Sequence, residues 1–345
     1  MPTKEELKQM QACPLNIKIS LTQARIREWV REYGTDGVYI SFSGGKDSTV
    51  LLHIVRELYP DIEAVFVNTG LEYPELQQFV KTFDNVTILR PAMRFDEVIK
   101  KYGYPIISKE ISTDIQYARK GSKWAIFKLQ GKNNNGAENA RKKFAKKYAP
   151  LIETDFEISS YCCAVMKKKP ANDYRKKTGK KPFIATLAVE SSLRENAWIK
   201  TGCNAFDAKH PKSAPMSFWT EQDVLQYIKK YNIPIAPVYG DITYTENPEQ
   251  IRAEEYGLDW CGTENLKTTG CDRTGCIFCA FGCHLEKEPS RFQRLKETHP
   301  RQYAYCIGGG EYDEDGVWKP NKKGLGMGRV FDELNKIYGE GFIKY

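Results

Sequence analysis

The segment Ser43-Gly44-Gly45-Lys46-Asp47-Ser48 combines residue types and spacing that suit phosphate binding. Its two glycines have no Cβ, so their backbone amides can approach an anion closely. A helix that opens at the end of the segment directs unsatisfied N–H groups and a partial positive charge toward the same place. The lysine and the two serines add an ammonium and hydroxyls. The order differs from the Walker pattern, which has four residues between its glycines and ends in Gly-Lys-Ser/Thr. The alternative is a glycine-rich turn without a ligand.

Cysteines form the second chemical pattern. Four of them follow the spacing Cys271-x4-Cys276-x2-Cys279-x3-Cys283, and the adjacent pair Cys162-Cys163 lies about a hundred residues earlier. Four thiolates suit a tetrahedral zinc ion or a [4Fe–4S] cluster, because both bind soft, anionic sulfur. Neighbouring cysteines are unusual zinc ligands, since they strain the backbone that they share. The adjacent pair therefore favours the iron–sulfur cluster, with zinc as the alternative.

The elements that must position these residues alternate between strand and helix. Apolar runs predict strands over 37–42, 62–67, 86–89 and 182–189, and helical periodicity predicts helices over 15–33, 49–59, 74–83 and 220–231. Thr220 is a candidate N-cap, with Asp223 three residues on. The alternation predicts an α/β fold with a parallel, twisted sheet flanked by helices. Ligands of such sheets bind beyond the carboxyl ends of the strands, where Ser43–Ser48 and Asn68-Thr69-Gly70 both fall.

In combination these motifs resemble the phosphoadenosine phosphosulfate (PAPS) reductase family of the PP-loop ATP pyrophosphatase superfamily, in its iron–sulfur branch. The similarity is carried by residues 43–48 and 66–74, by Cys162-Cys163 with Lys167 and Pro170, by Glu190-Ser191-x2-Arg194, and by residues 219–224, 233–239 and 275–279. The resemblance implies an enzyme that binds an adenine nucleotide such as ATP. It also implies one [4Fe–4S] cluster held by Cys162, Cys163, Cys276 and Cys279, with Cys271 and Cys283 as alternates.

The same resemblance assigns expected roles around the nucleotide. Lys46, Asp47 and Arg194 are the expected catalytic residues, with Lys46 and Arg194 neutralising charge on the leaving pyrophosphate. Mg²⁺ is expected to bridge the phosphates, with Asp47 as an indirect ligand. The expected nucleotide-binding residues are Ser43, Gly44, Gly45, Asp47, Ser48, Asn68, Thr69, Gly70, Lys109, Glu190 and Arg194.

Two departures from the family pattern bear on the reaction. Sulfate-reducing members carry a nucleophilic cysteine in a Glu-Cys-Gly-Leu-His-like tail, whereas residues 341–345 here read Gly-Phe-Ile-Lys-Tyr. The family also commonly has an arginine, able to grip sulfate or phosphate with two hydrogen bonds, where this chain has Leu187. We therefore expect ATP-dependent adenylation and sulfur transfer, with nucleic acid as one acceptor. The alternatives are a PAPS or adenylylsulfate (APS) reductase that uses an internal thiol such as Cys283 or Cys306, and a non-catalytic nucleotide-binding subunit.

Composition and charge set the domains and partners that we expect. The shift toward glycine, cysteine and turn residues predicts a nucleotide-binding α/β domain over 1–240, with a basic insertion or lid at about 119–150, and a cysteine-rich region over 241–345. The net charge is +8, and 18 Lys/Arg against five acids lie between residues 119 and 181. That block predicts a surface for a polyanion, with nucleic acid as the leading candidate and a solvated helix face as the alternative.

The remaining expectations concern compartment and assembly. No apolar run approaches the roughly 20 residues of a membrane helix, and the polar N-terminus is unlike a signal peptide. We therefore expect no membrane association and a cytoplasmic location, where ten cysteines are ligands or catalytic thiols rather than disulfides. A protein that donates sulfur or electrons and a second copy of the chain are the other expected partners.

Overall fold

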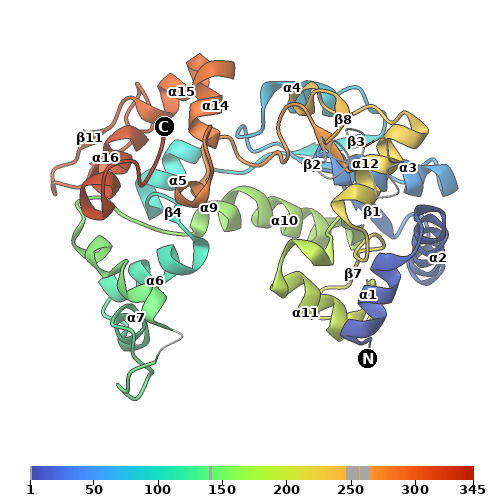
Figure 1. The fold of residues 1–345 in the computed structure, drawn as a ribbon, viewed down its shortest axis with the longest axis horizontal. Helices are drawn as coiled ribbons and strands as arrows, with labels where there is room; N and C mark the ends of the chain where they lie inside the picture. The colour runs from blue at the N-terminus through green and yellow to red at the C-terminus, as the bar shows by residue number, and fades with distance from the viewer. Residues whose placement is uncertain (1, 140–141, 246–255, 257–264) are drawn as a thin grey trace. The chain divides into compact units, whose positions relative to one another are not determined.

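The structure, a computed structural model, describes residues 2–139, 142–245, 256 and 265–345 (Figure 1). The chain forms two compact units, each built from several segments. Unit 1 comprises Met1–Asn68, Glu72–Leu89 and Ala171–Thr274, and unit 2 comprises Thr69–Leu71, Arg90–Pro170 and Gly275–Tyr345. This division differs from the predicted boundary near residue 240, because the segment after residue 274 packs with residues 90–170.

Unit 1 is built on a six-stranded sheet in the order β3-β2-β1-β5-β7-β6. Its strands are β1 (Val38–Ser41), β2 (Ala64–Val67), β3 (Val86–Leu89), β5 (Lys181–Phe183), β6 (Asn204–Ala205) and β7 (Lys212–Ser213). All neighbouring strands pair in parallel except β6 and β7. The sheet confirms the predicted α/β fold. The strand predicted over 182–189 ends at Phe183, and a 3₁₀ turn, Ala188–Glu190, lies at the end of the predicted range.

Helices cover this sheet and close the core of unit 1. They are α1 (Lys4–Ala12), α2 (Leu15–Tyr33), α3 (Lys46–Leu58), α4 (Pro74–Val80), α11 (Ser192–Thr201) and α12 (Glu221–Tyr231). Two further strands, β8 (Ile242–Tyr244) and β9 (Leu266–Thr268), pair antiparallel with each other. Helices α2, α3 and α12 pack against one another, as Figure 1 shows. Between α2 and α12 the buried Lys18 Nζ lies 2.6 Å from Asp223 Oδ2. This pair fixes the start of α12 against α2.

The N-cap predicted for α12 is confirmed, and it gives a first testable prediction. The Thr220 side chain accepts from the backbone N–H of Asp223, and the Asp223 carboxylate accepts from the backbone N–H of Thr220 at 2.6 Å. We expect Thr220→Ala to lower the free energy of unfolding by about 1 kcal/mol, because one helix-start donor loses its partner. Urea denaturation measures the change. Thr201→Ala, an exposed threonine at the end of α11, is the control and should change stability by less than about 0.5 kcal/mol.

Unit 2 is mainly helical and contains a short parallel pair of strands, β4 (Ile106–Ile107) and β10 (Ala280–Phe281). Its helices are α5 (Phe95–Tyr102), α6 (Lys109–Arg119), α7 (Lys123–Leu129), α8 (Lys143–Lys146), α9 (Tyr161–Cys163), α14 (Arg291–Thr298), α15 (Pro300–Ile307) and α16 (Met327–Tyr338), with a hairpin of β11 (Glu311–Tyr312) and β12 (Trp318–Lys319). The helix α10 (Lys169–Thr178) begins in unit 2 and continues into unit 1. The predicted insertion contributes buried Ala125, Leu129 and Ala145 to unit 2. No described helix is long and apolar enough to span a bilayer.

Candidate functional site

The predicted phosphate loop joins β1 to α3 in unit 1, as expected from the sequence. Gly44 has a φ of +74°, and a Cβ there would come within 2.7 Å of Val80 Cγ2 and 2.8 Å of Leu76 Cδ2, so the turn requires glycine. The loop's hydroxyls hold its shape. The Ser43 N–H donates to Ser48 Oγ at 3.2 Å, and the Gly45 N–H donates to Ser43 Oγ at 3.3 Å.

Residues from three later segments of unit 1 contact this loop. The Lys46 N–H donates to the Tyr239 hydroxyl at 3.1 Å, and that hydroxyl lies 2.7 Å from Thr274 Oγ1. The Lys46 side chain is buried, and its Nζ donates to the Asp272 carbonyl at 2.7 Å and lies 2.9 Å from Glu221 Oε1. The ammonium predicted for the leaving pyrophosphate is therefore held by a carboxylate in this structure. Sequence reasoning missed Glu221, because its partner lies far along the chain.

Two guanidinium groups share one carboxylate near the loop. Arg273 Nη2 lies 2.6 Å from Glu190 Oε1, and Arg194 also pairs with Glu190. Burial raises the pKa of Asp47, and the positive charges of Lys46 and Arg273 oppose that rise. Burial, followed by the charge of Arg273, lowers the pKa of Arg194. Of the predicted residues, Arg194 thus lies near both Glu190 and Asp47. The structure adds Arg273, which the cysteine-rich pattern around it had obscured.

The predicted adenosine contacts divide between the units. Asn68 belongs to unit 1, where its backbone N–H donates to the Leu89 carbonyl at 2.8 Å and its side chain donates to Gln77 Oε1 at 3.3 Å. Thr69 and Gly70 belong to unit 2. There the Thr69 hydroxyl accepts from the Leu71 N–H at 3.2 Å, and Gly70 has a φ of +75°. Of the three residues Asn68, Thr69 and Gly70, Asn68 therefore lies in the same unit as the phosphate loop.

Four cysteines predicted as a ligand set line one cavity in unit 2. Cys162, Cys163, Cys276 and Cys279 share this cavity with Leu71, Phe95, Pro105, Met166 and Lys167. The Sγ atoms of the adjacent pair lie 4.0 Å apart. Neither alternate is among the lining residues: Cys271 belongs to unit 1, and Cys283 is buried and donates to the Ala280 carbonyl at 3.0 Å. Four thiols along one cavity are the kind of soft donor set that a thiolate-bound iron–sulfur cluster uses.

The two cysteine pairs reach the cavity by different local structures. Cys162 and Cys163 lie in α9, which continues through a π-helical segment, Ala164–Lys168, into α10. Wider π-turns of this kind are frequent at functional sites.

The other cysteine pair lies in a tight turn, in which the Cys279 N–H donates to the Cys276 carbonyl at 3.0 Å. The turn is anchored on both sides, by Ile277 N–H to the Leu71 carbonyl at 2.8 Å and by Arg291 Nη1 to the Cys279 carbonyl at 2.8 Å. Strand β10 follows Cys279 directly and pairs with β4. In β4, Ile107 has a φ of +61°, a strained conformation for a β-branched residue.

Charge around the cavity favours thiolate at one position. The pKa of Cys163 falls to about 6, because it accepts from the Cys162 thiol and lies near the ammonium groups of Lys109 and Lys167. The pKa of Cys162 rises, because its thiol donates that hydrogen bond and is buried. Lys109, predicted to contact the nucleotide, is the first residue of α6 in unit 2, and its charge lowers the pKa of Cys163.

Among the described residues, no three His, Cys, Asp or Glu side chains converge closely enough to hold one metal ion.

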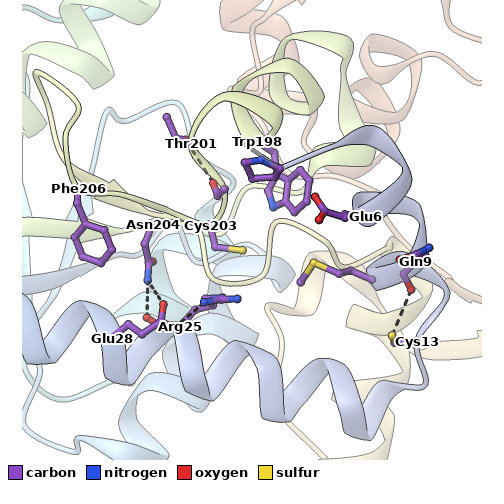
Figure 2. Close-up of a pocket in the computed structure, with 13 residues that line it drawn as sticks. Glu6, Gln9, Cys13, Arg25, Glu28, Trp198, Thr201, Cys203, Asn204 and Phe206 are labelled. Atoms are coloured by element: carbon purple, nitrogen blue, oxygen red, sulfur yellow. Dashed lines mark hydrogen bonds and ion pairs between the residues drawn. The ribbon is translucent and has the colours of Figure 1, made fainter.

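A pocket of about 770 Å³ in unit 1 lies apart from the predicted residues (Figure 2). Its lining comes from α1, α2 and the segment around the end of α11, and every lining residue is described; none is a predicted site residue. Its polar groups contact one another. Asn204 Nδ2 donates to the Arg25 carbonyl at 3.0 Å and to Glu28 Oε2 at 3.2 Å, and the Cys13 thiol donates to the Gln9 carbonyl at 3.3 Å.

Matches to known proteins include both the phosphate loop and the cysteines of the cavity. The family model of the phosphoadenosine phosphosulfate reductase domain matches residues 37–106 and 115–281. A phosphoadenosine 5'-phosphosulfate reductase of Xylella fastidiosa is 25% identical over 249 residues, covering 70% of this chain and 86% of that protein. An adenosine 5'-phosphosulfate reductase of Staphylococcus haemolyticus is 26% identical over 211 residues, covering 61% and 68%. The solved PAPS reductase of Candida auris, in a phosphate complex, aligns with a TM-score of 0.37 at 14% identity and covers 69% of this chain and 91% of that one.

Proposed function

The chain belongs to the phosphoadenosine phosphosulfate reductase domain family, and we propose that it is an iron–sulfur enzyme that activates an acceptor with ATP and transfers sulfur to it. One observation carries the proposal: the two cysteine pairs, about a hundred residues apart, line a single cavity. A [4Fe–4S] cluster bound there by Cys162, Cys163, Cys276 and Cys279 supplies an iron site for handling sulfur or electrons. The ammonium groups of Lys109 and Lys167 offset the negative charge of the thiolates.

The loop residues perform the nucleotide chemistry in this proposal. The amides and hydroxyls of Ser43–Ser48 bind the phosphates of ATP, and Asp47 would hold Mg²⁺ as an indirect ligand, where the ion would offset the charge of those phosphates. An oxygen of the acceptor attacks the α-phosphorus, the bond to the bridging oxygen breaks, and pyrophosphate leaves. Arg194 and Arg273 stabilise the negative charge of the leaving group. A partner protein then donates sulfur at the oxidation level of sulfide. The sulfur displaces AMP, so no net oxidant is needed.

Leu187 supports ATP over a sulfonucleotide as the substrate. The side chain is buried in the core of unit 1, where the family commonly supplies an arginine. Without that guanidinium, a bidentate contact to sulfate or to a second phosphate is lost.

Buried thiols also weigh against the internal nucleophiles of the alternative reductase. Cys283 and Cys306 are both buried. Burial raises the pKa of Cys283 to about 12 and raises that of Cys306 as well, whereas the reactive form of cysteine is the thiolate. A reductase therefore stands as the second candidate, supported by the reductases among the relatives.

Product analysis distinguishes the candidates. Protein purified without oxygen is incubated with ATP, Mg²⁺, sulfide and single-stranded RNA or DNA as the acceptor, and separately with PAPS or APS and a thiol reductant. The proposal expects pyrophosphate and AMP from ATP and no sulfite from either sulfonucleotide. Release of sulfite, with no pyrophosphate or AMP from ATP, would establish the reductase instead. ATP affinity without turnover in any mixture would indicate a nucleotide-binding subunit.

Arg273 gives a second prediction, on nucleotide affinity. We expect Arg273→Ala to weaken ATP binding about tenfold, because it removes one of the two guanidiniums paired with Glu190 beside the loop, and charged hydrogen bonds contribute about 1.5–3 kcal/mol when well shielded. The side chain is 59% exposed, so we expect the lower end of that range. Titration with a fluorescent ATP analogue measures it. Arg31→Ala, an exposed arginine of α2, should bind like the natural protein.

A further inference from the structure

Helices α6, α7 and α8 of unit 2 carry an unusual density of positive charge. Residues 117–148 contain ten Lys/Arg and one acid, Glu138. Two of the cations have structural roles. Arg119 donates to four backbone carbonyls of residues 151–156, and Lys128 Nζ lies 2.6 Å from Glu110 Oε1 and 2.8 Å from Asp114 Oδ2. Lys128 thereby neutralises the acids that α6 presents next to this surface.

Four of the other described lysines are at the surface. Lys120, Lys123, Lys146 and Lys147 are exposed. None of the ion pairs among the described residues involves Lys120, Lys123 or Lys146. A surface of this kind attracts polyanions, and charge alone would also suit a solvated helix face.

Exposed aromatic rings distinguish this surface from a solvated face. Tyr117 of α6 is 40% exposed, Trp124 of α7 is 41% exposed and Phe144 of α8 is 48% exposed. The rings of Tyr117 and Trp124 lie 5.6 Å apart between centroids, at 47°. The helices already bury Ala118, Ala125 and Leu129, and Figure 1 shows α6 and α7 side by side. The two rings therefore leave a large part of their surface open to solvent in addition to the buried contacts between the helices.

We propose that Tyr117, Trp124 and the lysines around them form a binding surface for single-stranded nucleic acid. Unpaired bases stack on the exposed rings, and Lys120 and Lys123 contact the phosphates between those bases. The base faces of a paired duplex are covered by their neighbours, so a duplex would contact the lysines but not the aromatic rings. The proposal names the acceptor class for the sulfur transfer above and rests on that function for its biological meaning. Binding itself is measured without turnover.

The test measures binding of fluorescein-labelled 20-nucleotide RNA and DNA, single-stranded and duplex, by fluorescence polarisation at two salt concentrations. We expect tighter binding of single strands than of duplexes, and the RNA and DNA arms identify the preferred sugar. The double variant Tyr117→Ala with Trp124→Ala should weaken single-strand binding about 30-fold, because each stacked base contributes about 5- to 150-fold. Tyr117→Phe with Trp124→Phe retains the rings and should bind within a few-fold of the natural protein.

Charge variants test the second half of the surface. Lys120→Gln with Lys123→Gln should weaken binding of all strands and lower the slope of log affinity against log salt by about 2. Lys322→Gln with Lys323→Gln, an exposed pair elsewhere in unit 2, is the matched control and should leave that slope nearly unchanged. Circular dichroism verifies that each variant is folded.

Any of three results would contradict the proposed binding surface. They are equal affinity for single strands and duplexes, unchanged single-strand affinity after both rings are removed, and equally tight binding to anionic vesicles or polyglutamate. The failure of the surface and that of the proposed function are separable. If oligonucleotides bind in a ring-dependent way but ATP yields no pyrophosphate, the binding surface is supported and the proposed reaction is wrong. If pyrophosphate is released with a different acceptor and no oligonucleotide binds, the reaction is supported and the binding surface is wrong.

Discussion

Serine in place of Cys276 is expected to remove most of the bound iron from the anaerobically purified protein, together with the broad visible absorption of thiolate-bound iron. The natural protein should contain about four iron atoms per chain. Cys276 lines the cavity with Cys162, Cys163 and Cys279, and a serine hydroxyl is a poor substitute for a soft thiolate ligand. Serine at each of the other three positions should give the same loss. Iron and sulfide analysis, with visible absorption, measures it.

Controls separate this cavity from the protein's other thiols. Cys13→Ser and Cys271→Ser, both in unit 1, should retain full iron content. Cys283 lies near Cys279 and outside the cavity lining, so Cys283→Ser should also retain it. A colourless natural protein with one zinc per chain would show that the site is a zinc site. Loss of iron in Cys271→Ser with retention in Cys162→Ser would mean that the ligand set is different.

Alanine at Gly44 is expected to weaken ATP binding by more than 100-fold. The added Cβ would collide with Val80 and Leu76 of α4, at 2.7 and 2.8 Å, and the residue would also keep a φ of +74°. Both effects displace a loop whose amides must point at the phosphates. Titration with ATP and Mg²⁺ measures the loss.

Gly34 supplies the matched control for that substitution. It ends α2 with a φ of +72°, and a Cβ there would have no atom within 4 Å. Alanine at either glycine therefore carries a backbone cost of about 1–3 kcal/mol, and Gly44→Ala alone adds a collision at the loop. Gly34→Ala should bind ATP normally while lowering the thermal midpoint. If the two variants bind ATP equally well, the loop is not the nucleotide site.

Local features of the fold were predictable from the sequence. Helix α2 has the predicted limits, strand β3 matches the apolar run at 86–89, and Thr220 caps α12. Each of these depends on periodicity or capping within a few residues, which the sequence displays directly. The phosphate loop also belongs to this class, because its glycines and its helix start are contiguous.

The surroundings of other site residues depend on contacts between distant segments. Lys109 lies with the cysteines of unit 2, because the two-residue strands β4 and β10 pair across about 170 residues of sequence. Strands this short leave no alternating pattern to detect. The partners of Lys46 likewise come from segments near residues 221, 239 and 272. Only the folded chain shows that this lysine is already paired with a carboxylate.

The π-helical segment Ala164–Lys168 sets the angular phase between Cys162-Cys163 and α10. A π-turn holds one residue more than an α-turn, so removing one residue from this segment would leave an unbroken α-helix. Each residue of an α-helix advances the chain by about 100° around the axis. Such a deletion would swing both cysteines about that far around the helix axis relative to Lys169 and Pro170, the residues of α10 that belong to unit 2. The extra residue of the π-helical segment thus sets the direction of the two thiols. Adding or removing a residue there would change that direction without changing any ligand.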